Sequence, residues 1–268
     1  MMLEHKKVLI IGGANGIGRA LYDLARSDDA AHVTVFDIDE HADAELQGDS
    51  VRYRHVDVTD SAALTAELGQ SWDEAGGFDA VANCAGFTIP RRIRDTSVPE
   101  FQAHLDLNLI PSLVLFRELG PRMQSQGHGA VVTVASVTAI RPLYGNVSYA
   151  AAKAGLIALT QVAALEYGPE VRCNVVAPGI TLTRLTSFID QTPEFRDPIV
   201  KALPAARIGR ADEVAAAMAF LLSDHASYIT GQLQAIDGGL TVSQPGMGPM
   251  AEATPDLLAE AYLGPKPQ

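Results

Sequence analysis

The sequence predicts a single-domain α/β fold in which a doubly wound parallel sheet carries helices on both faces. Short, continuously apolar segments alternate with segments of helical period along the chain. Continuously apolar strands are typical of parallel sheets that are covered on both faces, and right-handed crossovers between them give the doubly wound arrangement. The length of 268 residues suits one such domain, and no repeat, linker or block of charge divides it.

The expected elements follow one another in a regular order. Strand signals occur at residues 7–11, 32–36, 51–56, 79–81, 130–135, 171–176 and 232–236. Helical signals occur at 16–26, from about 60 to 75, from about 99 to 123, and at 149–166. Thr59-Asp60 provides a good N-cap for the second helix, and Gly168-Pro169 ends the last one. We therefore expect one domain over residues 1–242.

Two segments depart from this alternation. Residues 183–204 contain Pro193, Pro198 and Pro204 and follow the sixth strand, where a sheet of this kind leaves its ligand crevice open. We expect a substrate lid over about residues 183–210, with an ordinary pair of surface helices as the alternative. Residues 243–268 are rich in Gly and Pro, and this tail is either disordered or packs on a neighbouring subunit, with a short helix expected from Thr254 to Tyr262.

Composition and charge exclude several classes of function. Hydrophobic residues make up 47% of the chain and charged residues 19%, as in a globular enzyme. The formal charge of −12 argues against a nucleic-acid partner and against an anionic membrane surface. No uninterrupted apolar run reaches about 18 residues, and the apolar start is too short for a signal segment. Cys84 and Cys173 have no metal-like spacing, so we expect no metal, two buried thiols and a cytoplasmic location.

A glycine-rich turn joins the first strand to the first helix. It reads Gly12-Gly13-Ala14-Asn15-Gly16-Ile17-Gly18. Gly12 permits the tight turn, Gly16 removes a side chain where the backbone must approach phosphate, and Gly18 lets the helix pack closely. The helix N-terminus offers free N–H groups and positive potential to a pyrophosphate. This context predicts a dinucleotide site.

Asp37 ends the second strand, nineteen residues after Gly18. A carboxylate there accepts hydrogen bonds from both ribose hydroxyls of NAD and repels the 2′-phosphate of NADP. Asn15 and Ile38 are neutral, so the sequence favours NAD over NADP. The alternative role of Asp37 is a solvent-facing or helix-capping aspartate. Asp57-Val58 closes the third strand and is placed either to hold the adenine or to start the next helix.

Three residues in the second half of the chain suit proton transfer at a carbinol. Ser136 ends an apolar strand, and Tyr149 and Lys153 are four residues apart on one helical face. A free tyrosine has a pKa of about 10, and a nearby ammonium together with a positive nicotinamide would lower it. Tyr149 would then remove the hydroxyl proton as hydride leaves carbon, while Ser136 holds the same oxygen. In reduction, Tyr149 is the acid.

These motifs together resemble the short-chain dehydrogenase/reductase family over about residues 6 to 242. The matching segments are Gly12 to Gly18, Asp37, Asp57-Val58, Asn83-Cys84-Ala85-Gly86, Asn108, Ser136, Tyr149 to Lys153, Pro178-Gly179 with Thr183, Tyr228 to Gln232, and Asp237-Gly238-Gly239. The resemblance implies a Rossmann fold and a catalytic tetrad of Asn108, Ser136, Tyr149 and Lys153. In this family the asparagine kinks its helix and anchors a water that relays protons from the lysine, which also bonds the nicotinamide ribose.

The resemblance also implies further cofactor contacts. They come from Asn83, Ala85, Gly86, Pro178, Gly179, Ile180, Thr181 and Thr183, the last three of which would orient the carboxamide. The chain departs from the family at Ile11 and Cys84, where threonine and a second asparagine are usual. Both changes remove polar contacts near the turn at Asn83–Gly86.

The substrate is the least determined part of the prediction. Candidate wall residues are Thr138, Ile140, Leu143, Tyr144 and Asn146, with Phe188 and Ile189 on the lid. They are mostly apolar, which favours a hydrocarbon ring or chain. A carboxylated or phosphorylated substrate is the alternative, because four arginines could approach this pocket: Arg91, Arg92, Arg94 and Arg184.

We expect an NAD-dependent oxidoreductase for a secondary alcohol, including cyclic and hydroxylated ones, and its ketone. The alternatives are a 3-oxoacyl thioester reductase, which Asp37 disfavours, and a non-catalytic NAD sensor or scaffold, which an intact tetrad disfavours. In relatives, the helices that carry Asn108 and Tyr149 pair between subunits. The expected assembly is a homotetramer, with a dimer second.

Overall fold

The computed structural model describes residues 1–42, 46, 48–184 and 186–243, apart from the side chains of Phe188 and Phe195. Its centre is a seven-stranded sheet, parallel throughout, in the order β3-β2-β1-β4-β5-β6-β9. The strands are β1 (Lys7–Ile11), β2 (His32–Asp37), β3 (Val51–His55), β4 (Ala80–Asn83), β5 (Gly129–Val134), β6 (Val171–Pro178) and β9 (Leu233–Ile236). The predicted doubly wound sheet is confirmed. The expected tail helix lies outside the described residues.

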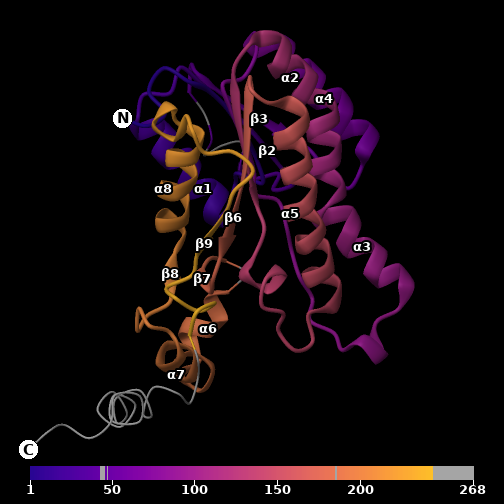
Figure 1. Ribbon diagram of the computed structural model, residues 1–268, viewed down its shortest axis with the longest axis vertical. Coiled ribbons are helices and arrows are strands. Elements are labelled where there is room, and N and C mark those ends of the chain that lie inside the picture. The colour runs from indigo at the N-terminus through magenta and orange to yellow at the C-terminus, as the bar shows by residue number, and fades with distance from the viewer. Residues whose placement is uncertain (43–45, 47, 185, 244–268) are drawn as a thin grey trace, which may run out of the picture.

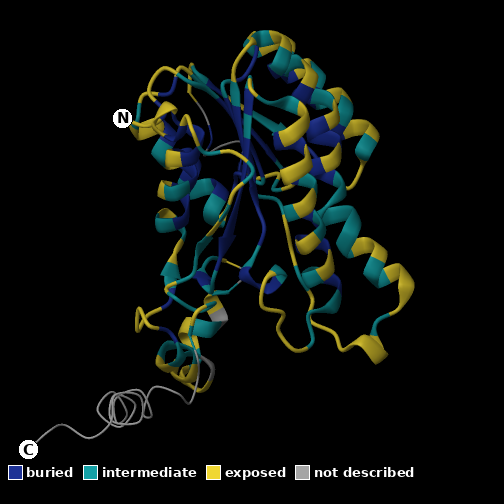
Figure 2. Ribbon diagram, viewed as in Figure 1, coloured by how far each residue is buried: buried dark blue, intermediate teal, exposed yellow. Residues whose placement is uncertain are grey.

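Helices cover both faces of this sheet (Figure 1). One face carries α1 (Gly16–Ser27) and α8 (Ala211–Leu222), which pack on each other. The other carries α2 (Ser61–Ala75), α4 (Ile110–Gln126) and α5 (Val147–Tyr167), with α3 (Val98–Asn108) against α5. Two apolar cores result, one on each side of the sheet, and Figure 2 shows the strands as the most buried layer.

The helix boundaries follow their capping residues. Asp60 caps α2 as expected, since its carboxylate accepts the N–H groups of Ala62 and Ala63 at 3.0 Å. Ser97 and Glu100 form a capping box that starts α3. By length and hydropathy, α5 could cross a membrane. The core helix of a globular protein can have the same length and hydropathy. Here α5 packs on β6 and against α3 and α4.

Two helix predictions need correction. The single helix expected over residues 99–123 is two helices, because the backbone at Leu109 leaves the helical region (φ −128°, ψ −54°) and Pro111 begins a new first turn. We predicted no helix at residues 211–222, where α8 lies. Its sequence is apolar almost all round and six of its residues are buried, so it lacks the polar face that marks an amphipathic helix.

The segment predicted as a lid contains two helices, α6 (Ser187–Gln191) and α7 (Pro193–Ala202), and it is flanked by a short strand pair, β7 (Thr181–Leu182) with β8 (Gly209–Arg210). We keep the name lid for this segment as a prediction. These elements lie together beyond the carboxyl ends of the strands (Figure 1). The strand pair fixes both ends of the lid, since β7 leads into it and β8 follows it.

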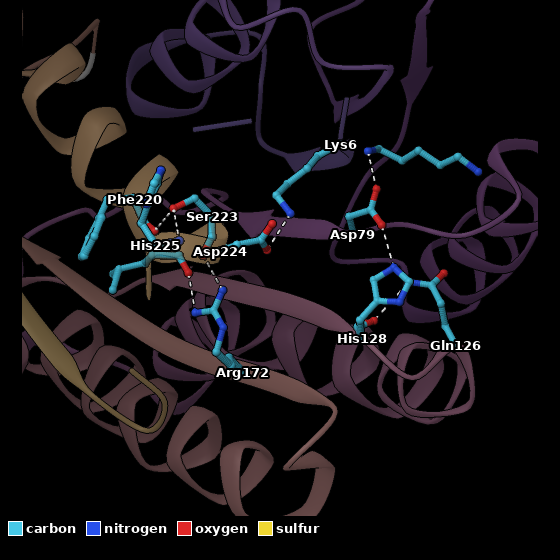
Figure 3. Close-up of polar contacts among 11 residues, drawn as sticks. Lys6, Asp79, Gln126, His128, Arg172, Phe220, Ser223, Asp224 and His225 are labelled. Carbon is cyan, nitrogen blue, oxygen red and sulfur yellow. Dashed lines mark hydrogen bonds and ion pairs between the residues drawn. The ribbon is translucent and has the colours of Figure 1, made fainter. Parts of the chain in front are cut away.

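The amino ends of the strands are closed by polar contacts, most of them between segments distant in sequence (Figure 3). Asp79, just before β4, accepts the N–H of Lys7 at 2.7 Å and lies 2.8 Å from Nε2 of His128, just before β5. Lys6 pairs with Asp224 at 2.9 Å. Arg172 of β6 donates to the carbonyl oxygens of Leu221 and Ser223, at 2.7 and 2.9 Å, and so satisfies the end of α8.

Candidate active site

A cavity of about 610 Å³ opens at the carboxyl ends of β1, β2, β4, β5 and β6. Ligands of doubly wound sheets bind at this edge, where the strand order reverses. Of the residues predicted to hold the cofactor, every one except Asn83 lines the cavity: Gly12, Asn15, Gly16, Ile17, Gly18, Asp37, Ile38, Asp57, Val58, Ala85, Gly86, Tyr149, Lys153, Pro178, Gly179, Ile180, Thr181 and Thr183. Segments from the whole length of the chain therefore meet in one crevice.

The glycine turn has the geometry that its residue types predict. Gly12 and Gly16 have φ of +76° and +57°, in the region that favours glycine. A Cβ on Gly12 would lie 2.7 Å from the nitrogen of Ala85, and one on Gly18 would lie 2.1 Å from the carbonyl oxygen of Gly12. A Cβ on Gly16 would meet Thr183 of the lid at 3.2 Å. The turn thus packs on β4 and on its own helix, and the lid crosses it.

Backbone N–H groups hold the carboxylate of Asp37 at the end of β2. One oxygen accepts from Ala14 at 2.8 Å, and the other accepts from Ile38 at 2.8 Å and Asp39 at 3.1 Å. The carboxylate is therefore anchored beside the glycine turn. Asp57 also lines the cavity, and it accepts from the backbone and hydroxyl of Thr59, which hold the pKa of Asp57 below its ordinary value.

Backbone contacts hold the turn after β4 in spite of the departures at Ile11 and Cys84. The N–H of Cys84 donates to the carbonyl of Ile11 at 2.8 Å. The buried Asn83 accepts from Ala85 at 3.1 Å and donates to Ser112 at 2.8 Å, so it supports the turn from behind the cavity wall. Burial raises the pKa of the Cys84 thiol to about 12, and such a thiol is a weak nucleophile.

The predicted catalytic groups meet at the other end of the cavity. Ser136 follows β5, while Tyr149 and Lys153 lie one turn apart near the start of α5, and all three line the cavity. Lys153 is 2% exposed, and its ammonium donates to the carbonyl of Val134 at 2.8 Å. That nitrogen lies 5.7 Å from the centre of the Tyr149 ring.

Burial dominates the electrostatics of this pair. It raises the pKa of Tyr149 above its ordinary value, against a hydrogen bond with Ser136 that acts in the opposite direction. Burial also lowers the pKa of Lys153 to about 8. The protein's own groups therefore do not lower the pKa of Tyr149, because burial outweighs the hydrogen bond with Ser136. The predicted lowering by the lysine together with a positive nicotinamide stays a prediction.

Asn108 stands behind this pair and outside the cavity lining. At the end of α3, its amide donates to the carbonyls of Phe87 and His104, both at 3.0 Å, and its oxygen accepts from the N–H of Phe87 at 3.2 Å. A Cβ on Gly86 would lie 2.9 Å from the Asn108 oxygen and 3.0 Å from the Lys153 nitrogen. The absence of a side chain at Gly86 therefore leaves room for both side chains on that side of the backbone, and Asn108 fixes Phe87, which follows Gly86.

The substrate wall differs from the predicted one. Among the described residues, Thr138, Ile140, Leu143, Tyr144 and Asn146 are absent from the cavity lining, whereas the expected lid residue Ile189 lines it. Thr138 is buried against Ser136, Leu143 and Tyr144 are exposed, and Asn146 contacts Thr88 at 3.2 Å. The side chain of Phe188 lies outside the described residues.

Sequence reasoning missed several lining residues, namely Val56, Phe87, Thr88, Leu107, Val134, Ala135 and Thr186. Phe87 and Thr88 directly follow the Asn83–Gly86 motif in sequence, and this position could have predicted that they line the cavity. Of the four arginines considered, Arg184 lines the cavity. Arg91 pairs with Glu100 at 2.8 Å, Arg94 lies 3.6 Å from Asp95, and Arg92 stacks on Tyr144 at 5.5 Å.

Comparison with known proteins gives consistent matches over nearly the whole chain. The profile of a family described as Enoyl-(Acyl carrier protein) reductase matches residues 12–241. The chain is 32% identical over 246 residues to the NAD-dependent glycerol dehydrogenase of Listeria innocua, covering 90% of this chain and 95% of the relative. It is 34% identical over 249 residues to a 3-oxoacyl acyl-carrier-protein reductase of Thermotoga maritima, covering 90% and 100%.

Among solved structures, the fold is similar to that of levodione reductase. The TM-score is 0.83 with 31% sequence identity, and the match covers 90% of this chain and 100% of the other. Relatives of this likeness include both alcohol dehydrogenases and oxoacyl reductases.

Proposed function

The chain belongs to the short-chain dehydrogenase/reductase family, and we propose that it is an NAD-dependent oxidoreductase that interconverts a secondary alcohol and its ketone. One observation carries the proposal. Ser136, Tyr149 and Lys153 line the same cavity as the glycine turn and Asp37. A group for moving a proton thus faces the same space as a site for a dinucleotide.

The residues fit a nicotinamide cofactor. Gly16 leaves the turn open to a phosphate, the first turn of α1 offers N–H groups, and Oδ2 of Asp37, which has one backbone partner, can accept from a ribose hydroxyl. A second carboxylate, Asp39, lies close by, and both repel a 2′-phosphate. These charges support NAD rather than NADP. The bound cofactor supplies the hydride acceptor, or donor, and a positive ring when oxidised.

Tyr149 moves the proton in the proposed reaction. In oxidation the phenolate takes the proton of the substrate hydroxyl as hydride leaves the carbinol carbon, and Ser136 donates a hydrogen bond to that oxygen. The protein's own groups raise the pKa of Tyr149, and the positive charge of an oxidised nicotinamide would favour its phenolate. Lys153, buried and with a pKa of about 8, is placed to exchange a proton near neutral pH. Asn108 fixes the adjoining wall and supports the proposed relay.

The cavity wall supports an apolar secondary alcohol. Together with Ser136 and Tyr149, its lining includes the apolar residues Phe87, Leu107 and Ile189 and further hydroxyl groups from Thr88, Thr181, Thr183 and Thr186. These side chains accept a ring or chain that carries further hydroxyl groups. The decisive experiment is an absorbance screen with NAD over secondary alcohols, hydroxysteroids, sugar alcohols, dihydrodiols and hydroxy acids. If the protein binds NADH but oxidises none of these alcohols, the result would support an NAD sensor or scaffold instead.

A 3-oxoacyl thioester reductase is the second candidate, because the matching family profile and one relative bear acyl-carrier-protein reductase names. Asp37 and Asp39 count against it, since such reductases usually use NADPH. Reduction of a 3-oxoacyl thioester with NADPH, faster than any alcohol oxidation with NAD, would favour this candidate.

We propose a homotetramer, with a dimer second. Leu113 of α4 and Val162 and Leu165 of α5 are exposed, Leu165 to 84%, which leaves an apolar strip on the outer faces of these two helices. Tyr228 and Phe220, near β9, are exposed on a second surface. Light scattering that gives the mass of one chain would reject the assembly. We also propose a cytoplasmic location with neither nucleic acid nor membrane as partner, in keeping with the charge of −12.

A further inference from the structure

The lid crosses the crevice at the glycine turn, and Arg184 makes the crossing contact. Its Nη1 lies 3.4 Å from Oδ2 of Asp39, the second residue after β2. The side chain of Asn15, within the glycine turn, donates to the same oxygen at 3.2 Å. The neighbouring lid residue, Thr183, lies against Gly16. Two contacts therefore join this segment to the nucleotide end of the cavity, and the charged one is the ion pair of Arg184 with Asp39.

Charge at this end of the cavity is unbalanced toward the negative. The described lining residues include two cations, Arg184 and Lys153, and Lys153 is committed to the carbonyl of Val134 at the other end. Asp37 and Asp39 both lie beside the glycine turn. A dinucleotide brings two further negative charges on its pyrophosphate. The N–H groups of a helix N-terminus offset only part of that charge, and Arg184 is the described lining cation within reach of the turn.

We propose that Arg184 is a pyrophosphate-binding residue that exchanges partners, from Asp39 to the pyrophosphate, when a dinucleotide binds. The inference rests on the proposed dinucleotide site. The side chain of Arg184 is 79% exposed and its ion pair is long, so the pair with Asp39 is weak and easily exchanged. A guanidinium can donate two hydrogen bonds to two phosphate oxygens at once. With Asp39 it makes a single contact with one carboxylate oxygen, at 3.4 Å, which is weaker. The exchange brings the lid down on the cofactor.

The pyrophosphate is favoured over a 2′-phosphate by the neighbours of Arg184. Thr183 contacts Gly16, which is the turn residue whose missing side chain leaves room for the pyrophosphate. The ribose end instead carries the anchored carboxylate of Asp37, which repels a 2′-phosphate.

The test is a double-mutant cycle on NADH binding, measured by fluorescence titration of the full chain. We expect Arg184→Gln to weaken NADH about tenfold and to reduce the salt dependence of the dissociation constant. Asp39→Asn keeps the Asn15 contact but removes the competing charge, so it should tighten NADH about threefold. In the Arg184→Gln background, Asp39→Asn should have a much smaller effect, because no guanidinium remains to be released.

Controls separate the alternatives. Arg196→Gln removes the same charge from α7, where Arg196 pairs with Asp197, and should leave NADH binding unchanged. Adenosine competition, which involves no phosphate, should be equal in wild type and Arg184→Gln. The proposal is overturned if the two Asp39→Asn effects are equal, if adenosine weakens as much as NADH, or if NADPH loses much more affinity than NADH, which would assign Arg184 to the 2′-phosphate. Wild-type protein that binds no NADH would refute the proposed function itself.

Discussion

Charged side chains gather at both edges of the sheet, but they are used differently. At the amino edge, Asp79, Lys6 and Arg172 each have a partner within the protein, and their contacts tie strand starts to neighbouring segments (Figure 3). At the carboxyl edge, Lys153 is buried with a carbonyl as its acceptor, and Asp37 is anchored through its backbone contacts beside an open cavity.

The difference indicates that charged residues at the amino edge stabilise the fold, whereas those at the carboxyl edge serve the cavity. An ion pair near the surface stabilises the fold a little, and its charged groups are already paired, so they are less available to bind a ligand. A buried ammonium without a carboxylate partner destabilises the fold. Such a group is typical of a site that binds a substrate or cofactor. Substitutions at the two edges should therefore change different measurements.

The largest effect is expected at Tyr149. Tyr149→Phe removes the hydroxyl that moves the proton but keeps the ring over which Lys153 lies. Turnover should fall about 10³-fold, while NADH binds with nearly unchanged affinity. The measurement is steady-state kinetics on the best substrate from the screen, paired with fluorescence titration. Near-normal turnover would remove Tyr149 from the mechanism.

Asp37 should show the next largest effect, and in binding rather than chemistry. Asp37→Ala removes a carboxylate expected to accept from the ribose hydroxyls, so the dissociation constant for NADH should rise about 10- to 100-fold. NADPH should lose much less affinity or gain some, since the repulsion of its 2′-phosphate is also removed. Equal losses for the two cofactors would contradict the ribose assignment.

Lys153 should reveal a conflict between stability and activity. With a folded pKa of about 8 against an ordinary value of 10.5, its cost to folding develops as pH falls from 10.5 to 8 and is complete below pH 8. Lys153→Met should raise the free energy of unfolding by about 2 kcal/mol at pH 7, after loss of the bond to Val134, while lowering turnover by less than Tyr149→Phe does.

Denaturant unfolding at several pH values checks this prediction. The advantage of the methionine variant should shrink as pH rises toward 10.5, because the unfolded lysine then loses its proton as well. A variant that is less stable than wild type at pH 7 would show that the ammonium is better compensated than its surroundings indicate.

The smallest effect is expected at the amino edge. Asp79→Ala leaves the N–H of Lys7 without its acceptor and breaks the contact with His128, so the free energy of unfolding should fall by about 1 to 2 kcal/mol. Values of kcat and KM should not change, because Asp79 directly precedes β4, whereas the cavity lies at the carboxyl ends of the strands. His128→Ala, which removes the more exposed half of the contact, should cost less. A change in KM would break the comparison of the two edges.

Much of this molecule could be predicted from local sequence, and the failures have physical causes. The central strands of the main sheet were predicted because parallel strands buried on both faces are largely apolar. The edge strands β3 and β9 are only partly buried and carry polar residues, but they were also predicted. The helix α8 was missed since a helix buried nearly all round has no polar face. The cavity lining could be predicted only in part, because Phe87 and Thr88 line it while residues 140–146, which follow Ser136 in sequence, do not; the predicted substrate contacts of this loop stay a prediction.

The sequence by itself determined the types of residue at each strand end, and therefore the family and the kind of chemistry. Glycines at 12, 16 and 18, Asp37, and the Tyr149 and Lys153 pair are local signals, since each depends on a turn, a strand end or one helical face. Only the tertiary structure decided that burial raises the pKa of Tyr149 and lowers that of Lys153, and that Arg184 meets Asp39 across 145 residues of chain. Desolvation and long-range pairing depend on which segments surround a group, and no local pattern records that.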